Sequence, residues 1–265
     1  MDHDEIKDLT DLAIEASKIG AAIQQEGWST GFSVEAKGTH GDVVTDIDVA
    51  AEAAIRDFLT AKRPNDSFIG EESAPLNKDS GIRWIVDPID GTANYLRRSE
   101  NCAVSVGVEV NDDHLIGVVH QPATGKIWVG TPSEATRNGT SIEVAKRSTL
   151  AETVWATGFA ATPIDRERQI VLFNNMMTVV RDCRRTGSPA IDLANVAEGT
   201  VDGYVEFGLG LEDYAGGVAL VKAAGGHVDI VDVSPWRGPL VIAAGTSELV
   251  TSMREIVRSA EVPNT

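Results

Sequence analysis

The sequence is poor in positive charge, and this shortage excludes several classes of partner. Its 265 residues contain 23 lysines and arginines against 40 aspartates and glutamates, which gives a formal net charge of −17. Nucleic acids and anionic membranes are bound by basic surfaces, so neither is an expected partner. An acidic protein that handles an anion must supply positive charge locally, from a few basic side chains or from a bound metal ion.

Cysteine is also scarce, and long apolar runs are missing. The two cysteines, Cys102 and Cys183, have no spacing that is typical of a metal cluster or a disulfide framework. No apolar run approaches the length of a membrane span, and the N-terminal stretch MDHDEIKDLT lacks the basic segment and apolar core of a signal peptide. We therefore expect a soluble, cytoplasmic protein with no membrane partner.

The first 150 residues predict helices followed by an antiparallel sheet. Apolar residues recur at helical spacing over about residues 5–26, and Thr45 with Asp48 resembles a capping box for a second helix, which Pro64 ends. After a short strand at residues 68–69, the chain changes to β-rich runs joined by tight turns. These short connections favour antiparallel pairing over βαβ crossovers.

Beyond about residue 150, predicted strands and helices alternate. We expect strands near residues 154–157, 203–207, 228 and 240, and helices over about 164–181, 189–198, 213–224 and from 247 onward. The sequence contains neither a Pro-, Gly- or Ser-rich linker nor a repeat. It therefore predicts an α/β (α+β) fold of two closely packed lobes, residues 1–150 and 151–265, that form one continuous structural unit.

The segment WIVDPIDGTANY, residues 84–95, places two aspartates where an apolar run ends. Pro88 restricts the chain after Asp87, and Asp90 is well placed as the N-cap of a helix that begins at about Gly91. Alone, each aspartate has an ordinary structural role as a turn residue or a cap. Together, two carboxylates at a helix start are typical of a site for Mg²⁺, and the first N–H groups of the helix can hold an anionic oxygen.

Further carboxylates occur at the boundaries of other predicted elements. Glu71 and Glu72 follow Gly70 at the end of a short strand, while Asp48 and Asp213 lie at helix starts. Each has a structural alternative, an exposed acidic turn for the glutamates and a helix cap for the aspartates. Their recurrence at element boundaries, where functional residues collect, favours a shared site.

These segments together resemble the inositol monophosphatase family, which comprises Mg²⁺-dependent and often lithium-sensitive phosphomonoesterases. The resemblance covers most of the chain and rests on residues 42–48, 70–72, 84–95, 212–217 and 225–226. The DPIDGT core is its most specific part. The resemblance implies a layered αβαβα sugar-phosphatase fold, usually assembled as a homodimer.

The same resemblance implies the metal ligands. Glu71, Asp87 and the main-chain carbonyl of Ile89 would bind the first Mg²⁺. Asp87, Asp90 and Asp213 would bind the second, and Glu71 would help to hold a third, weaker ion through water. Bound metal ions neutralise a phosphate monoester, lower the pKa of water and stabilise the leaving alkoxide.

Roles for the remaining candidate residues also follow from the resemblance. Asp48 and Thr92 would orient the attacking water, with Glu71 completing the catalytic set, and Gly91 and Thr92 would donate N–H groups to the phosphate. A substrate wall would meet the alcohol. Its implied residues are Asp90, Ser188, Pro189, Glu206, Glu212 and Asp213.

Two positions depart from the family pattern. Glu212 stands where the family commonly has tryptophan, and Pro189 stands where a small residue such as alanine is usual. Proline is natural at the first position of a helix. Glu212 either turns to solvent or favours a substrate that carries an amine, such as histidinol phosphate. Because neither change removes a predicted metal ligand, we expect the hydrolytic site to be intact.

The expected partner is a small phosphorylated metabolite, with inositol monophosphate as the leading substrate. Glu206 suits a polyol because a carboxylate accepts hydrogen bonds from neighbouring hydroxyl groups. Histidinol phosphate, fructose 1,6-bisphosphate, a nucleotide 3′-phosphate and a dinucleotide phosphate stay open as alternatives.

Two other readings of the function are open. Asp46-Ile47-Asp48 resembles the strand-borne DxD of haloacid-dehalogenase-type phosphatases, in which the first aspartate becomes phosphorylated. A non-catalytic paralogue that binds metal or phosphate is the second, and Glu212 is the feature that favours it. No G-x-S-x-G elbow supports an α/β-hydrolase. The scattered histidines are interpreted as ordinary surface or core residues, at His40, His114, His120 and His227.

Overall fold

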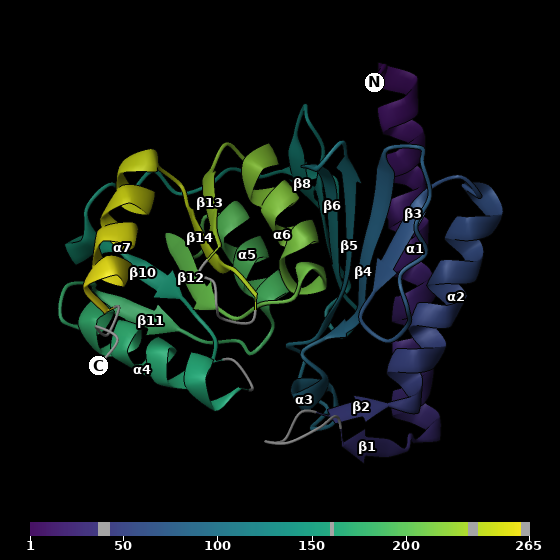
Figure 1. Cartoon of the computed structure of the whole chain (residues 1–265), viewed down its shortest axis with the longest axis horizontal. Coiled ribbons are helices and arrows are strands. Elements are labelled where there is room, and N and C mark those ends of the chain that lie inside the picture. The colour runs from purple at the N-terminus through teal and green to yellow at the C-terminus, as the bar shows by residue number, and fades with distance from the viewer. Residues whose placement is uncertain (37–42, 160–161, 233–237, 261–265) are drawn as a thin grey trace.

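The computed structural model of the chain describes residues 1–36, 43–159, 162–232 and 238–260. From right to left in Figure 1, the layers are an outer helix pair, a seven-stranded sheet, a central helix pair, a five-stranded sheet and a second outer helix pair. The predicted αβαβα arrangement is therefore confirmed. In the order of the layers, the helices are α1 (His3–Thr30), α2 (Asp46–Lys62), α5 (Pro189–Ala197), α6 (Leu211–Ala223), α4 (Pro163–Met177) and α7 (Ser247–Ala260).

The seven-stranded sheet is built from consecutive segments of the chain. β3 and β4 are parallel, and the remaining pairs within it are antiparallel, as the tight turns between the β-rich runs predict. Its strands, in spatial order, are β3 (Ser67–Gly70), β4 (Ile82–Asp90), β5 (Ala103–Val110), β6 (Asp113–Gln121), β7 (Lys126–Gly130), β8 (Ala135–Arg137) and β9 (Thr140–Ser141).

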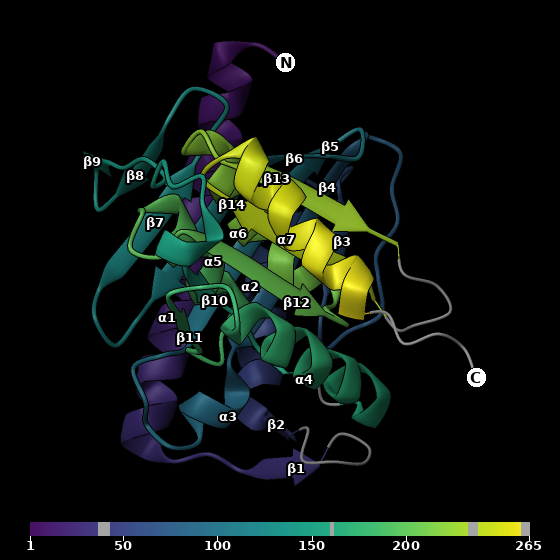
Figure 2. The ribbon, with the colours of Figure 1, turned by 90° about the vertical axis from the view of Figure 1, so that its left-hand side faces the viewer.

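The five-stranded sheet mixes parallel and antiparallel pairs. β10 pairs in parallel with both β11 and β12, whereas β14 pairs antiparallel with β12 and β13. Figure 2 shows α4 and α7 in front of this sheet. The predicted division into two lobes at residue 150 falls between the sheets and stays a prediction. The strands are β11 (Asp182–Arg184), β10 (Val154–Ala156), β12 (Gly203–Phe207), β14 (Leu240–Ala244) and β13 (His227–Val231).

The sequence pattern misses the shortest elements and misplaces some ends. β11, β1 (Val34–Ala36) and β2 (Val43–Thr45) have three residues each, too few for alternation to show. The helix predicted over 164–181 ends at Met177, because the β-branched residues 178–180 that follow favour helix less. Two further short elements are a helix, α3 (Thr92–Tyr95), and a 3-10 turn (Leu150–Glu152).

Helices α1 and α2 cover the outer face of the seven-stranded sheet. Leu9 and Ala13 of α1 and Ile55 and Leu59 of α2 are buried in one apolar cluster with strand residues such as Val106. In the described ranges, no helix is both long enough and apolar enough to cross a lipid bilayer.

On the inner face, glycines let α6 lie directly against the same sheet. Gly107, Gly117 and Gly130 lie on three neighbouring strands, and a Cβ atom at Gly117 would come within 2.0 Å of the carbonyl oxygen of Gly216. Such close packing leaves the helix little freedom to shift. The contact therefore fixes the first turn of α6, which carries Asp213.

Candidate functional site

Two of the candidate aspartates come from the end of β4, where its pairing with β5 is irregular. Asp87 pairs with Ser105 and Asp90 with Ala103, so three steps along β4 match two steps along β5. In a regular strand, residues three apart point to opposite faces, whereas the extra residue of a bulge turns them to the same side. Pro88 lies within this bulge, where its missing N–H is tolerated.

Asp90 is not a helix N-cap, contrary to the expectation from the sequence. The strand continues through Asp90, and Gly91, with a φ of 94°, takes the N-cap position of the single-turn helix α3. Asp90 Oδ2 instead accepts hydrogen bonds from Ser188 Oγ at 2.5 Å and from Ala190 N at 2.7 Å. The unpaired N–H groups at the start of α5 attract this carboxylate.

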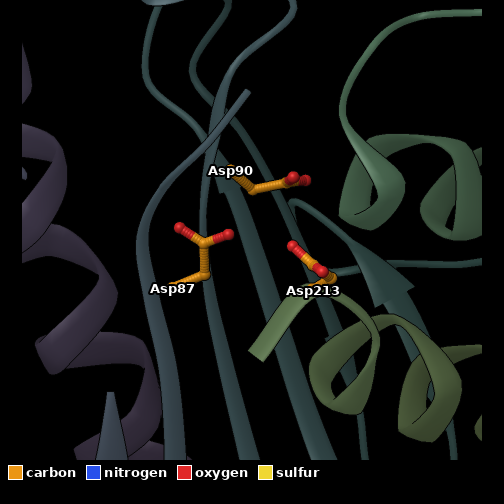
Figure 3. Close-up of side chains that lie close together, drawn as sticks. All are labelled: Asp87, Asp90 and Asp213. Atoms are coloured by element: carbon orange, nitrogen blue, oxygen red, sulfur yellow. The ribbon is translucent and has the colours of Figure 1, made fainter. Parts of the chain in front are cut away.

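Asp213 joins the two aspartates from the first turn of α6. Gly210 is the N-cap of α6, and Asp213, the third helical residue, supports this helix start by accepting a hydrogen bond from Gly210 N through its Oδ2 at 2.6 Å. Carboxylate oxygens of Asp87, Asp90 and Asp213 lie within 4.8 Å of one another. Figure 3 shows the three side chains around a common space between β4 and the start of α6.

This cluster of carboxylates is electrostatically unfavourable without a cation. Burial raises the pKa of Asp87 well above its usual range, and the charge of Glu71 adds to the rise. Burial, together with the charge of Asp90, also raises the pKa of Asp213 well above its usual range. A divalent cation would remove this repulsion, and Mg²⁺ prefers oxygen ligands of this kind. The residues present therefore fit a Mg²⁺ site.

Asp48 and Thr92 form a hydrogen-bonded pair beside the cluster. Thr92 Oγ1 lies 3.0 Å from Asp48 Oδ1 and 3.1 Å from the carbonyl oxygen of Ile89, so its proton has two available acceptors. Thr45 holds the other oxygen of Asp48 through its hydroxyl group and through its N–H at 2.8 Å. The predicted capping box of α2 is confirmed, and it fixes Asp48 towards Thr92.

The end of β3 brings Glu71 alongside the two aspartates of β4. Gly70 pairs in parallel with Val86, so the next residue, Glu71, is level with Asp87. Within the bulge, Ile89 N donates to Asp87 Oδ1 at 2.9 Å and helps to fix that carboxylate. The roles of Glu71, Asp87 and the carbonyl of Ile89 as metal ligands stay predictions.

A single cavity of about 360 Å³ joins the metal-binding candidates with the substrate wall. Asp48 and Glu72 are the candidate residues that do not line it; Asp48 contacts the lining residue Thr92, and the backbone N–H of Glu72 donates to Glu52. The candidates that line it are Glu71, Asp87, Ile89, Asp90, Gly91, Thr92, Ser188, Pro189, Glu206, Glu212 and Asp213.

Glu206 of β12 is held within the wall by its neighbours. The hydroxyl group of Tyr204 donates to Glu206 Oε2 at 2.7 Å. A Cβ atom at Gly158 would lie 2.3 Å from the same oxygen, so the glycine lets the carboxylate approach the chain. Burial raises the pKa of Glu206 to about 7, although the Tyr204 hydrogen bond and the charge of Arg185 oppose the rise.

Two residues that line the cavity, Arg185 and Asp192, are not among those predicted from the sequence. Arg185 is the one lysine or arginine among the described residues that line the cavity. Asp192 is buried in α5, and its Oδ1 has no hydrogen-bond partner within the described part of the chain. The sequence does contain one indication that Asp192 belongs to the site, because it lies one helical turn after the candidate Ser188. Arg185 lies in the basic run RDCRR, which gives no comparable signal.

The geometry does not support the aspartyl-phosphate alternative. Asp46 is exposed and does not line the cavity, and its Oδ1 accepts a hydrogen bond from Ser33 N at 2.9 Å. It is the first residue of α2 rather than part of a strand. A phosphorylated Asp46 would therefore be separated from the acidic cluster.

The described histidines also lie outside the cavity. His114 Nδ1 is 2.9 Å from Glu109 Oε1, His120 is buried, and His227 is exposed on β13. These positions agree with ordinary core and surface roles. His40 lies outside the described residues.

Known proteins share both the sequence pattern and the fold. A model of the inositol monophosphatase family matches residues 5–259. The Nus factor SuhB of Escherichia coli K12 is 35% identical over 254 residues, which cover 92% of this chain and 94% of that protein. An inositol-1-monophosphatase from Synechocystis sp. PCC 6803 is 33% identical over 228 residues, which cover 85% of this chain and 79% of that protein.

A solved structure also has the same fold as this chain. The extragenic suppressor protein suhB from Bartonella henselae superposes with a TM-score of 0.86 at 30% identity, covering 94% of this chain and 98% of that one. The matched region includes the acidic cluster, the Asp48–Thr92 pair and the wall. The chain therefore belongs to the inositol monophosphatase family.

Proposed function

We propose that the protein hydrolyses a small phosphate monoester with Mg²⁺ as its cofactor. The observation that carries this proposal is the meeting of the Asp87–Asp90–Asp213 cluster and the Asp48–Thr92 pair at one cavity. A cavity lined by so many carboxylates can admit an anionic phosphate only when bound cations offset their charge. Membership of a phosphatase family supports the same chemistry.

The acidic residues would hold two to three Mg²⁺ ions. Glu71, Asp87, Asp90 and Asp213 offer carboxylate oxygens, and Ile89 offers its carbonyl. When bound, Mg²⁺ neutralises the phosphate, lowers the pKa of water and stabilises the leaving alkoxide. The N–H groups of Gly91 and Thr92 are proposed to contact the phosphate, although α3 is only a single turn.

The Asp48–Thr92 pair would position the attacking water. When Thr92 donates its proton to Asp48, the lone pairs of Thr92 Oγ1 can accept a hydrogen bond from water and orient it. The clamp from Thr45 keeps Asp48 in place for this role. The enzyme then needs no covalent nucleophile.

Inositol monophosphate is the proposed substrate. Glu206 in the wall can accept hydrogen bonds from neighbouring hydroxyl groups of a polyol. The name of the Synechocystis relative, inositol-1-monophosphatase, supports this choice. Histidinol phosphate is the second candidate, because the wall also carries the carboxyl groups of Glu212 and Asp192, whose oxygens would accept hydrogen bonds from an amine.

A non-catalytic role is a different kind of candidate. The E. coli relative is named a Nus factor rather than a phosphatase. For this chain the complete set of candidate ligands favours catalysis, and its net charge of −17 disfavours direct binding of nucleic acid. From family membership we further propose a cytoplasmic, lithium-sensitive homodimer.

A phosphate-release panel tests the substrate assignment. Wild type would be compared on inositol monophosphate, histidinol phosphate, fructose 1,6-bisphosphate, a nucleotide 3′-phosphate and a dinucleotide phosphate, each with and without Mg²⁺. We expect the highest kcat/KM for inositol monophosphate. Absence of Mg²⁺-dependent release from all of them would contradict the proposed function.

Variants of Glu212 separate its charge from its shape. Glu212→Trp restores the common family residue, and Glu212→Gln removes only the charge. If histidinol phosphate is preferred and both variants reverse that preference, the wall recognises an amine and the inositol assignment is wrong. If neither variant changes the order of substrates, Glu212 has no part in selecting them.

A further inference from the structure

One face of α2 carries polar side chains that contact Thr92 and the chain around Glu71. Asp48, Glu52 and Arg56 follow one another at intervals of four residues and so share a face of the helix. Asp48 contacts Thr92, as described above. The other two residues line no part of the cavity, and no role in the reaction has been given to them.

Glu52 contacts both neighbours of Glu71. It is 1% exposed, and its Oε2 accepts a hydrogen bond from Glu72 N at 2.7 Å. A Cβ atom at Gly70 would lie 2.4 Å from Cδ and Oε2 of Glu52 and 2.6 Å from Oε1, so the whole carboxylate packs against the Gly70 backbone. The chain on both sides of Glu71 is thus held against α2.

Arg56 holds the same loop one helical turn further along. Its Nη1 donates to Ser73 Oγ at 2.7 Å and to the carbonyl oxygen of Ala74 at 3.2 Å. Its guanidinium carbon also lies 5.6 Å from the ring centroid of Phe68, in the strand that leads to Glu71. Arg56 therefore bridges the strand before Glu71 and the loop after it.

We propose that Glu52 and Arg56 are positioning residues that fix the backbone of Glu71 beside Asp87, so that Mg²⁺ affinity depends on them. The inference rests on the proposed function for the metal role of Glu71. A carboxylate ligand loses affinity when its backbone is free to move, because that motion must be suppressed on binding. α2 is a suitable support, since its N-terminus is fixed by the capping box.

Calorimetric titration of the metal-free protein with MgCl₂ tests this inference without relying on activity. Glu52→Met removes the acceptor of the Glu72 N–H while keeping a similar volume, and we expect it to weaken Mg²⁺ binding about 10-fold or more, the usual effect of losing a group that holds a metal ligand in place. Glu52→Gln keeps an acceptor oxygen and should retain most of the affinity. Arg56→Met should weaken binding in the same direction.

Glu198→Met is the matched control. Glu198 is also a buried carboxylate, accepting from Trp128 Nε1 and Arg137 Nη1 at 2.8 Å each, but it lies outside the cavity. This variant should lower the thermal unfolding temperature without changing Mg²⁺ affinity. If Glu52→Met is destabilised to the same extent as the control and keeps wild-type affinity, the positioning role is wrong.

Phosphate release by the same preparations separates this inference from the proposed function. Wild-type Mg²⁺ affinity in Glu52→Met, together with normal turnover in wild type, overturns the positioning role alone. Weakened Mg²⁺ binding in Glu52→Met, with no turnover of any monoester by wild type, supports the positioning role and contradicts the proposed function. A wild-type protein that binds no Mg²⁺ would overturn both.

Discussion

At the residue scale, most of the candidate carboxylates are held by a specific neighbour. Thr45 fixes Asp48, the start of α5 fixes Asp90, and Tyr204 fixes Glu206. These contacts keep buried acids in place, and burial raises the pKa values of all three. The stability of the metal-free protein should therefore depend on pH.

Glu206 gives the clearest case of this dependence. Burial raises its pKa from 4.5 to about 7, so the folded state binds the proton more tightly than the unfolded chain does. The stabilisation is complete below the unfolded pKa and is lost as the pH rises through about 7. It amounts to on the order of 3 kcal/mol, because each pKa unit corresponds to about 1.4 kcal/mol.

Urea unfolding in EDTA, between about pH 5 and pH 8, tests this prediction. Glu206→Gln keeps an acceptor for the Tyr204 hydroxyl group but cannot ionise. The variant should therefore lose less stability than wild type as the pH rises. Equal losses in the two proteins would show that Glu206 does not titrate in this range.

At the element scale, the bulge in β4 and the glycine contact of α6 bring the aspartates together. Alternation and turn residues in DPID predict that the strand ends at Asp87 and that Asp90 caps a helix. The strand instead continues through a bulge to Asp90. A bulge depends on how β4 pairs with β5, so one segment of the sequence alone does not reveal it. The carboxylate cluster could be predicted, but the geometry that produces it could not.

Gly117 tests the importance of the close contact beneath α6. A Cβ atom there would meet the carbonyl oxygen of Gly216 at 2.0 Å, and this backbone atom cannot move without displacing the helix. We expect Gly117→Ala to lower the free energy of unfolding by roughly 1–3 kcal/mol, the usual cost of overpacking. Displacement of Asp213 should also weaken Mg²⁺ binding in calorimetric titration.

The control is Gly203→Ala in β12. There an added Cβ would first meet the side chain of Met253, with Cε at 2.7 Å, and a flexible methionine can move aside. This variant should be less destabilised and should keep wild-type Mg²⁺ affinity. If the two variants have the same free energy of unfolding and the same Mg²⁺ affinity, the packing of α6 against the sheet does not control the site.

At the scale of the whole molecule, the cavity joins segments that are far apart in the sequence. Of its lining residues, Glu71, Asp87 and Asp90 precede residue 150, whereas Asp213 and most of the wall follow it. The family and its layered fold could be predicted, because the DPIDGT core and the other motifs occur in a specific order. Arg185 could not, since its place depends on how the loop before α5 packs against the rest of the chain.

The identity of the substrate alcohol is the feature that the sequence predicts least, because it too depends on how distant segments pack together. Glu206 and Glu212 enter the cavity from different segments, and neither carries a sequence pattern specific to one alcohol. We propose that this part of the wall selects the substrate. The carboxylate cluster, by contrast, supports the proposed reaction.

Mg²⁺-dependent phosphate release from inositol monophosphate by wild type, Asp90→Asn and Asp46→Asn is the most direct test of the account. Wild type and Asp46→Asn should release phosphate with Mg²⁺ and stop when EDTA is added, because Asp46 lies outside the cavity. Asp90→Asn should lose more than about 100-fold in turnover, which exceeds the usual effect of losing a residue that only supports a metal ligand, while keeping a folded circular dichroism spectrum. Near-normal turnover by Asp90→Asn, or release by wild type that does not need Mg²⁺, would contradict the account.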